Sequence, residues 1–171
     1  MLSYQELRAT ACDGDVLLVE GRGWVSALIR ALTGQSISHV AVLLWFDEHL
    51  FVAEMKEFHG YRLRPASLWV DDSLASGSVY YGAAPRAVVE DGDGIIAAAL
   101  SYRNHRYSYV SLLSVWLAQI FRRRLSGGLV CSTFVQRIWE TCGYHFDQTA
   151  DPGDYLRMCE FVLPVTGDAN G

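Results

Sequence analysis

The sequence lacks the long apolar run that a membrane-spanning helix requires. Such a helix needs about 20 consecutive, predominantly apolar residues, and the longest apolar stretch, residues 110–121, is interrupted by two serines and a glutamine. The N-terminal region also lacks an apolar segment followed by a small-residue cleavage site, so we expect no secretory signal. These absences predict a cytoplasmic protein without a transmembrane segment.

Positive charge is also scarce. The 171 residues include 14 Lys and Arg against 19 Asp and Glu, a formal net charge of -5, which argues against nucleic acid as a partner. Apolar residues make up 51% of the chain and charged residues 19%, so the chain has enough apolar surface to fold on its own. We expect one domain over residues 1–166 and a flexible tail at residues 167–171. The sequence indicates no oligomeric state.

The four cysteines do not form a metal or redox motif. They are Cys12, Cys131, Cys142 and Cys159, and no two of them form the C-x-x-C pair that is typical of zinc sites and thiol–disulfide exchange. A chain of this length does not need a disulfide framework. We therefore predict free thiols, no metal and no cofactor.

Two glycine-containing segments resemble ligand-binding loops but depart from them. Residues 21–26 follow a predicted strand, as a dinucleotide-binding loop does, but Ser26 stands where the third glycine belongs. Residues 91–94 resemble the start of a calcium loop, but Tyr102 stands where a bidentate glutamate is needed. We interpret the first segment as a strand-to-helix connection and the second as a helix start capped by Asp93.

Apolar runs and alternating patterns predict strands, and apolar residues at three- and four-residue steps predict helices. We expect strands at residues 15–19, 38–46, 50–54, 61–64 and 78–81, with a polar turn at 47–49 and a loop between the last two strands. We expect helices at residues 24–32, 95–100, 113–120 and 134–142. Consecutive strands joined by short turns predict an α+β fold, with an antiparallel sheet packed against helices.

Cys131 is a candidate nucleophile because it lies where the last predicted helix begins. Unpaired N–H groups in the first turn of a helix favour a thiolate. Small residues before it, including Gly128, leave room for a substrate carbonyl and free amides for an oxyanion. The alternative is a core cysteine, since Cys is among the most buried residue types.

His39 is the histidine whose position favours a catalytic base. It opens an apolar strand, where a buried imidazole needs a partner, and its unperturbed pKa suits proton transfer near pH 7. The alternative is a buried structural histidine. The other four histidines lie in a predicted turn or among polar neighbours, so we expect them in solvent: His49, His59, His105 and His145.

Glu54 is the candidate partner of the imidazole. It interrupts the apolar strand at residues 50–54, where a carboxylate is costly unless it is paired, and a carboxylate can orient a catalytic histidine. An even number of residues in the turn after Phe46 would put Glu54 on the same sheet face as His39, and an odd number would put it on the opposite face.

Several segments together match the pattern of a known family. They are residues 14–18 with 38–42, residues 51–54 with 61–65, residues 107–109, and residues 129–135. They resemble, in this order, the histidine motif, the strand pair with the acidic residue, the tyrosine segment and the nucleophile helix of the circularly permuted NlpC papain-like superfamily. This branch includes the YiiX-like proteins and the lecithin retinol acyltransferase group. The chain departs from it at residues 104–106, where Asn-His-Arg replaces the glycine that usually precedes the tyrosine.

The resemblance implies a permuted papain-like fold with an assigned set of site residues. Cys131 would be the nucleophile, His39 the base and Glu54 the orienting residue, with no metal. Substrate contacts would come from Tyr107, Ser132 and Gly128.

The function implied is a cysteine hydrolase that cleaves amide bonds through a thioester, acting on a small peptide or a peptidoglycan fragment. The alternative is a lipid acyl hydrolase or acyltransferase with the same residues. The missing export signal favours the lipid reaction, since a cytoplasmic protein meets mature cell wall only after lysis or specialised secretion. Basic residues 122–124 would then allow peripheral membrane contact. A third reading is a binding module in which Cys131 and His39 belong to the core.

Overall fold

The structure is a computed structural model that describes residues 1–57, 59–105 and 130–167. Over these residues the chain forms a six-stranded antiparallel sheet of order β4-β3-β2-β1-β5-β6. The strands are β1 Val16–Gly21, β2 His39–Phe46, β3 His49–Lys56, β4 Gly60–Pro65, β5 Gly77–Gly82 and β6 Val162–Val165. The sheet and its helices confirm the predicted α+β class.

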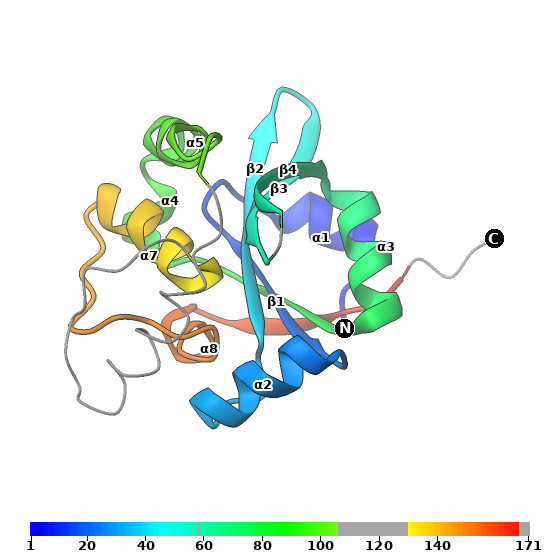
Figure 1. The fold of residues 1–171 in the computed structure, drawn as a ribbon. Coiled ribbons are helices and arrows are strands. Elements are labelled where there is room, and N and C mark those ends of the chain that lie inside the picture. The colour runs from blue at the N-terminus through cyan, green and yellow to red at the C-terminus, as the bar shows by residue number, and fades with distance from the viewer. Residues whose placement is uncertain (58, 106–129, 168–171) are drawn as a thin grey trace.

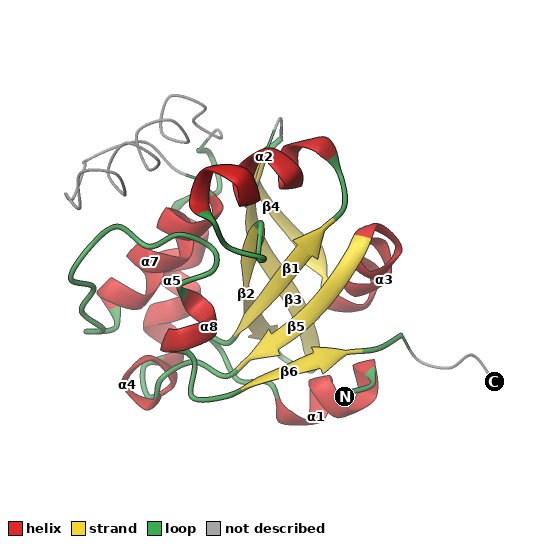
Figure 2. Cartoon of the chain, turned by 90° about the horizontal axis from the view of Figure 1, so that it is seen from below, coloured by secondary structure: helices red, strands yellow, loops and turns green. Residues whose placement is uncertain are grey.

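Helices cover both faces of the sheet (Figures 1 and 2). They are α1 Tyr4–Thr10, α2 Trp24–Thr33, α3 Ala66–Ser76, α4 Arg86–Val89, α5 Gly92–Ser101, α7 Cys131–Thr141 and α8 Tyr155–Met158. Helix α7 packs on β2 and β3 with α5 beside it, and α3 packs on β5, β3 and β4. In the described part of the chain, no helix has the length and apolar character needed to cross a membrane.

Each face of the sheet has its own core, because successive side chains of a strand point to opposite faces. Val40 and Val42 of β2 contribute to the core that includes α7. Ala41 and Leu43 contribute to the core that includes α3. Strand β2 is therefore covered on both faces, which explains why its sequence is an almost continuous apolar run.

The segment before β1 ties the sheet to α7. The buried carboxylate of Asp15 accepts hydrogen bonds from the backbone N–H groups of Cys12 at 2.7 Å and Ala84 at 2.8 Å. The carbonyl of Gly14 accepts one from Nε1 of Trp139 in α7 at 2.9 Å. These bonds fix where α7 lies relative to the strands that carry the candidate site.

The turn between β2 and β3 contains two residues, Asp47 and Glu48. Asp47 has a φ of 53°, the left-handed conformation common in two-residue turns that match the twist of a hairpin. His49, which we expected in the turn, is the first residue of β3 and pairs with Phe46. The expectation was wrong by one residue, and the even count fixes the register discussed below for Glu54.

Residues 66–76 form helix α3, where we expected a loop. Trp69 and Val70 are buried, but Leu68 is 55% exposed, so the apolar residues of this segment do not follow one helix face. Without such a stripe, the helical period is hidden in the sequence.

Helix α5 begins earlier than expected. Asp91, not Asp93, is the N-cap, and its side chain accepts a hydrogen bond from the N–H of Gly94 at 3.2 Å. Asp93 lies in the first turn, where its charge favours the helix dipole. The helix predicted at residues 24–32 is confirmed as α2, which ends at Gly34 with a left-handed φ of 69°.

Several predictions fall outside the described residues. These are the helix at residues 113–120 with its basic end, the substrate contacts Tyr107 and Gly128, and the tail from residue 168 onward. Conversely, α1, α4, α8 and β6 are short elements that we did not predict from the sequence.

Candidate active site

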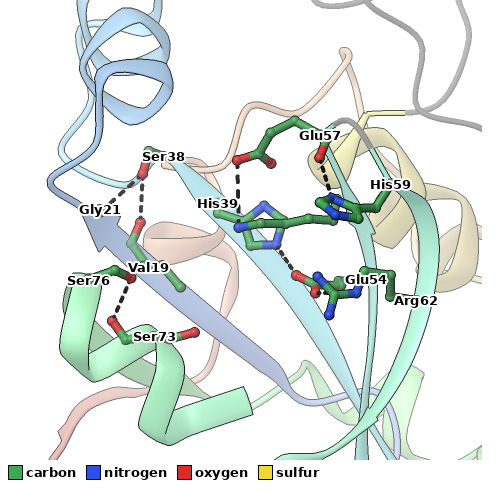
Figure 3. A network of polar contacts seen from close by, with 11 residues as sticks. Val19, Gly21, Ser38, His39, Glu54, Glu57, His59, Arg62, Ser73 and Ser76 are labelled. Atoms are coloured by element: carbon green, nitrogen blue, oxygen red, sulfur yellow. Dashed lines mark hydrogen bonds and ion pairs between the residues drawn. The ribbon is translucent and has the colours of Figure 1, made fainter. Parts of the chain in front are cut away.

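His39 and Glu54 form a buried pair on neighbouring strands (Figure 3). Nε2 of His39 lies 2.8 Å from Oε2 of Glu54. His39 is 7% exposed and Glu54 is 1% exposed, so each would be costly to bury alone. We expected from the sequence that each of these two buried side chains needs a partner, and each is the partner of the other.

The strand register explains this contact. Val42 pairs with Ala53, so Ala41 lies opposite Glu54, and His39 is two residues farther along the same face of β2. Side chains in such a diagonal relation come within reach of each other when they are long. The two-residue turn thus brings Glu54 to the face of His39, as the even-numbered alternative required.

Cys131 is the first residue of α7 and is 3% exposed. The N-cap, Val130, has no polar side chain with which to cap the helix, and its own N–H donates to Oγ1 of Thr133 at 3.0 Å. Hydrogen-bonding capacity therefore remains on the first-turn amides beside the thiol. Cys131 therefore lies in the first turn of a helix, as the sequence predicted; its reactivity stays a prediction.

Glu54 and Cys131 both act on the imidazole of His39. Burial lowers the pKa of His39, but hydrogen bonding and electrostatic interaction with Cys131 and Glu54 outweigh burial and raise the pKa to about 10. Since Nε2 is bonded to Glu54, Nδ1 is the ring nitrogen left for the thiol. Cys131, at the start of α7, is thus one of the groups that raise the pKa of this imidazole.

Glu54 is held in its charged form. Burial raises the pKa of this carboxyl, but its hydrogen bond to His39 and the charge of His39 lower the pKa to about 2, with Trp69 and Lys56 acting in the same direction. Arg62 on β4 adds a second cation, with Nε 4.0 Å from Oε1 of Glu54. The pair is therefore an imidazolium and a carboxylate at neutral pH, and an imidazolium is the form that stabilises a thiolate.

Trp69 is a contact that we did not predict. Its ring is stacked on His39, with centroids 6.4 Å apart and planes 26° apart. It belongs to α3, which we expected to be a loop, so nothing in the sequence suggested that its indole faces the sheet. The only available signal in the sequence was one large aromatic residue, Trp69, with the apolar residues Leu68 and Val70 on either side.

The other cysteines are poor nucleophiles. Burial raises the thiol pKa of Cys12 and Cys142, and it raises that of Cys159 to about 12. The four other histidines are all exposed, as expected: His49, His59, His105 and His145. Among the described histidines, His39 is therefore the buried one.

Ser132, predicted as a substrate contact, is 1% exposed. Its backbone carbonyl accepts a hydrogen bond from the hydroxyl of Tyr155 at 2.8 Å, whereas its own hydroxyl has no partner among the described residues. Its role in substrate binding stays a prediction. So do those of Tyr107 and Gly128, which lie outside the described ranges.

A pocket that we did not predict lies beside His39. It has a volume of about 240 Å³ and includes Arg22, the first turn of α2, Lys56, and Ser73 and Ser76 of α3 in its wall. The segment at residues 21–26, interpreted above as a simple strand-to-helix connection, forms one side of it. The available signal was Arg22, a basic residue between two glycines.

No protein-family model matches the sequence, and no curated protein matches it either. Among solved structures, the fold is similar to that of the protein described as metalloprotein yiiX from Escherichia coli O157:H7, DUF1105. The TM-score is 0.54 at 14% sequence identity, and the similarity covers 91% of this chain and 96% of that one. At this identity the similarity concerns the fold. The chain therefore has a YiiX-like α+β fold, in agreement with the fold expected from the sequence.

Proposed function

We propose that this protein is a cysteine hydrolase that cleaves amide bonds in small peptides, with Cys131 as nucleophile. The observation that carries the proposal is the buried pair of His39 and Glu54, 2.8 Å apart, together with Cys131 at the start of α7, which raises the pKa of the same imidazole. A buried charged pair is costly to maintain for stability alone. Its position beside a thiol at a helix N-terminus gives it a chemical use.

The reaction would begin with attack of the Cys131 thiolate on the substrate carbonyl. A C–S bond forms, and the carbonyl π electrons move to the oxygen, where first-turn N–H groups of α7 stabilise the negative charge. His39 donates its proton to the leaving nitrogen as the C–N bond breaks. Water then attacks the thioester, His39 accepts a proton from this water, and the carboxylic acid leaves with the thiolate restored.

Glu54 would act through His39 and not on the substrate. Its carboxylate accepts the Nε2 hydrogen bond, which leaves Nδ1 directed to the thiol and stabilises the positive ring that forms in the catalytic cycle. Glu54 is thus a positioning residue in this mechanism.

The protein of similar fold is described as a metalloprotein. Within residues 1–57, 59–105 and 130–167, no group of three or more His, Cys, Asp or Glu side chains is arranged to hold one.

The proposal is tested by replacing Cys131 with alanine. Turnover of a library of short peptides should fall by about a thousandfold or more, while circular dichroism and thermal unfolding show that the fold is retained. Cys12→Ala is the matched control, because Cys12 is exposed and plays no part in the mechanism. Equal activity of Cys131→Ala and Cys12→Ala would refute the nucleophile and favour a binding module with a core cysteine.

A lipid acyl hydrolase remains the second candidate, and one observation favours it. Trp24 is 73% exposed and Leu28, one helical turn later in α2, is 45% exposed, so the helix presents apolar side chains beside the pocket. Such residues on a short helix suit contact with a lipid surface. Sedimentation with anionic liposomes tests this: binding that Trp24→Ser abolishes would support the lipid substrate, and no binding would count against it.

A further inference from the structure

The pocket beside His39 is shaped by residues far apart in the sequence. Its wall includes the end of β1 and the start of α2, Lys56 and Glu57 at the end of β3, and Ser73 and Ser76 in α3. The buried hydroxyl of Ser38 holds one side in place: it accepts from the N–H of Gly21 at 3.1 Å and donates to the carbonyl of Val19 at 3.2 Å (Figure 3).

Gly21 is required by this arrangement. A Cβ at this position would lie 2.3 Å from Oγ of Ser26 and 3.3 Å from Oγ of Ser38, closer to the Ser26 oxygen than any unbonded contact allows. The bare backbone lets the two hydroxyls approach it, so the wall that faces His39 is polar and closely packed.

The charge of the pocket is positive. Nζ of Lys56 lies 3.6 Å from Oε1 of Glu57, so these two charges largely compensate each other. Among the described lining residues Glu57 is the acidic one, and the charge of Arg22 is therefore left uncompensated within the pocket. The N-terminal end of α2 adds partial positive charge.

We propose that this pocket binds a carboxylate of the substrate, and that the substrate is a small peptide or acylated amino acid with a free carboxylate close to the scissile amide. This inference rests on the proposed function and extends it to the substrate class. The guanidinium of Arg22 can donate two parallel hydrogen bonds to a carboxylate, and the serine hydroxyls can donate others.

Size and polarity favour this ligand over an acyl chain. Sites for drug-sized ligands have volumes of about 300–1,000 Å³, so a pocket of about 240 Å³ suits a residue-sized group. A carboxylate bound there would lie next to His39, which itself lines the pocket. The adjoining amide would then lie beside this imidazole.

Two alkylating probes that differ only in charge test the inference. N-chloroacetylglycine carries a carboxylate and N-chloroacetylglycinamide is neutral; in each, the Cys131 sulfur forms a bond to the CH₂ carbon and chloride leaves. Relative to glutathione, the native protein should favour the carboxylate probe about tenfold, which corresponds to roughly 1.4 kcal/mol. Adducts at Cys131 are quantified by mass spectrometry.

Arg22→Gln should reduce the preference for the carboxylate probe over the neutral probe to the preference that glutathione shows. Arg86→Gln is the matched control: it also removes one positive charge, from a side chain that is 86% exposed and paired with Glu90 on α4, and the preference should persist. An equal preference in the native protein and Arg22→Gln would overturn the inference, as would an equal loss in both arginine variants.

A binding measurement separates this inference from the proposed reaction. In Cys131→Ala, N-acetylglycine should shift the amide NMR signals of residues 21–26, and N-acetylglycinamide should not. This outcome supports the pocket even if no peptide is hydrolysed. Shifts from both compounds or from neither overturn it, and so does binding of inorganic phosphate without binding of N-acetylglycine. Peptide hydrolysis without any preference for a substrate carboxylate would refute the carboxylate pocket and leave the proposed hydrolase function standing.

Discussion

The indole of Trp69 is stacked on the imidazole of His39, with ring centroids 6.4 Å apart. Trp69 is 2% exposed, and it also lowers the pKa of Glu54 as a hydrogen-bond partner. One residue of α3 thus interacts with both members of the buried pair, while Cys131 on α7 raises the pKa of the same imidazole.

Trp69→Phe should lower kcat with little change in KM, because phenylalanine keeps a ring against His39 but lacks the N–H that reaches Glu54. A stacked pair contributes about 0.5–1.5 kcal/mol, so a reduction of up to about tenfold is expected. The pH profile of Cys131 alkylation should move to lower pH together with the pKa of His39.

Trp45→Phe is the control for this change. This substitution also removes a hydrogen bond donated by an indole Nε1, here to the carbonyl of Ala11. Trp45, however, lies at the opposite end of β2 from His39. A pH profile that moved equally in both variants would show that Trp69 acts through overall stability and does not position the imidazole.

Glu54→Gln should lower the pKa of His39 below its native value of about 10, because the neutral amide removes the negative charge while keeping the side-chain shape. Fewer imidazolium rings would then be present above pH 8 to stabilise the thiolate. The measurement is an NMR titration of the His39 ring beside alkylation of Cys131 from pH 6 to pH 10. The Asp72→Asn variant, at a 68% exposed carboxylate paired with Arg64, should titrate like the native protein. An unchanged pKa in Glu54→Gln would contradict the assigned pairing.

The unfolding free energy should be greatest at mildly acidic pH. The pKa of His39 is raised from 6.5 to about 10, so its contribution is complete below pH 6.5 and is lost as the pH rises toward 10. The pKa of Glu54 is lowered from 4.5 to about 2, so its contribution is complete above pH 4.5 and is lost as the pH falls toward 2. Both changes reflect one shared interaction.

Urea unfolding between pH 3 and pH 10 measures this dependence. His39→Gln should remove most of the alkaline decline, since glutamine does not titrate, and should leave a Glu54 carboxylate without its cationic partner. The variant should therefore be less stable than the native protein near pH 6 and closer to it near pH 10. A parallel loss at every pH would mean that His39 is uncharged in the folded protein.

Local patterns in the sequence were enough to predict the hairpin of β2 and β3 and the helix that begins near Cys131. A two-residue turn, once recognised, also fixes the face of Glu54, because side chains alternate along a strand. Burial of a histidine and a glutamate within apolar strands then required a partner for each. These conclusions depend only on neighbouring residues and on the cost of burying charge, so they can be predicted from the sequence.

The helix at residues 66–76 and its contact with His39 could not be predicted in this way. Trp69 is buried and Leu68 is exposed because of what surrounds them in the folded chain, and no period in the segment itself distinguishes the two. The pocket at Arg22 escaped prediction for a similar reason, since its wall combines residues of β1, α2, β3 and α3.

The sequence by itself determined the elements, the faces of their side chains and the need for buried charges to be paired. Only the tertiary structure decided that Trp69 stacks on His39 and that α7 packs on β2, with Trp139 bonded to the carbonyl of Gly14. Local preferences act between residues a few positions apart, whereas the meeting of distant elements is set by how their apolar faces pack together.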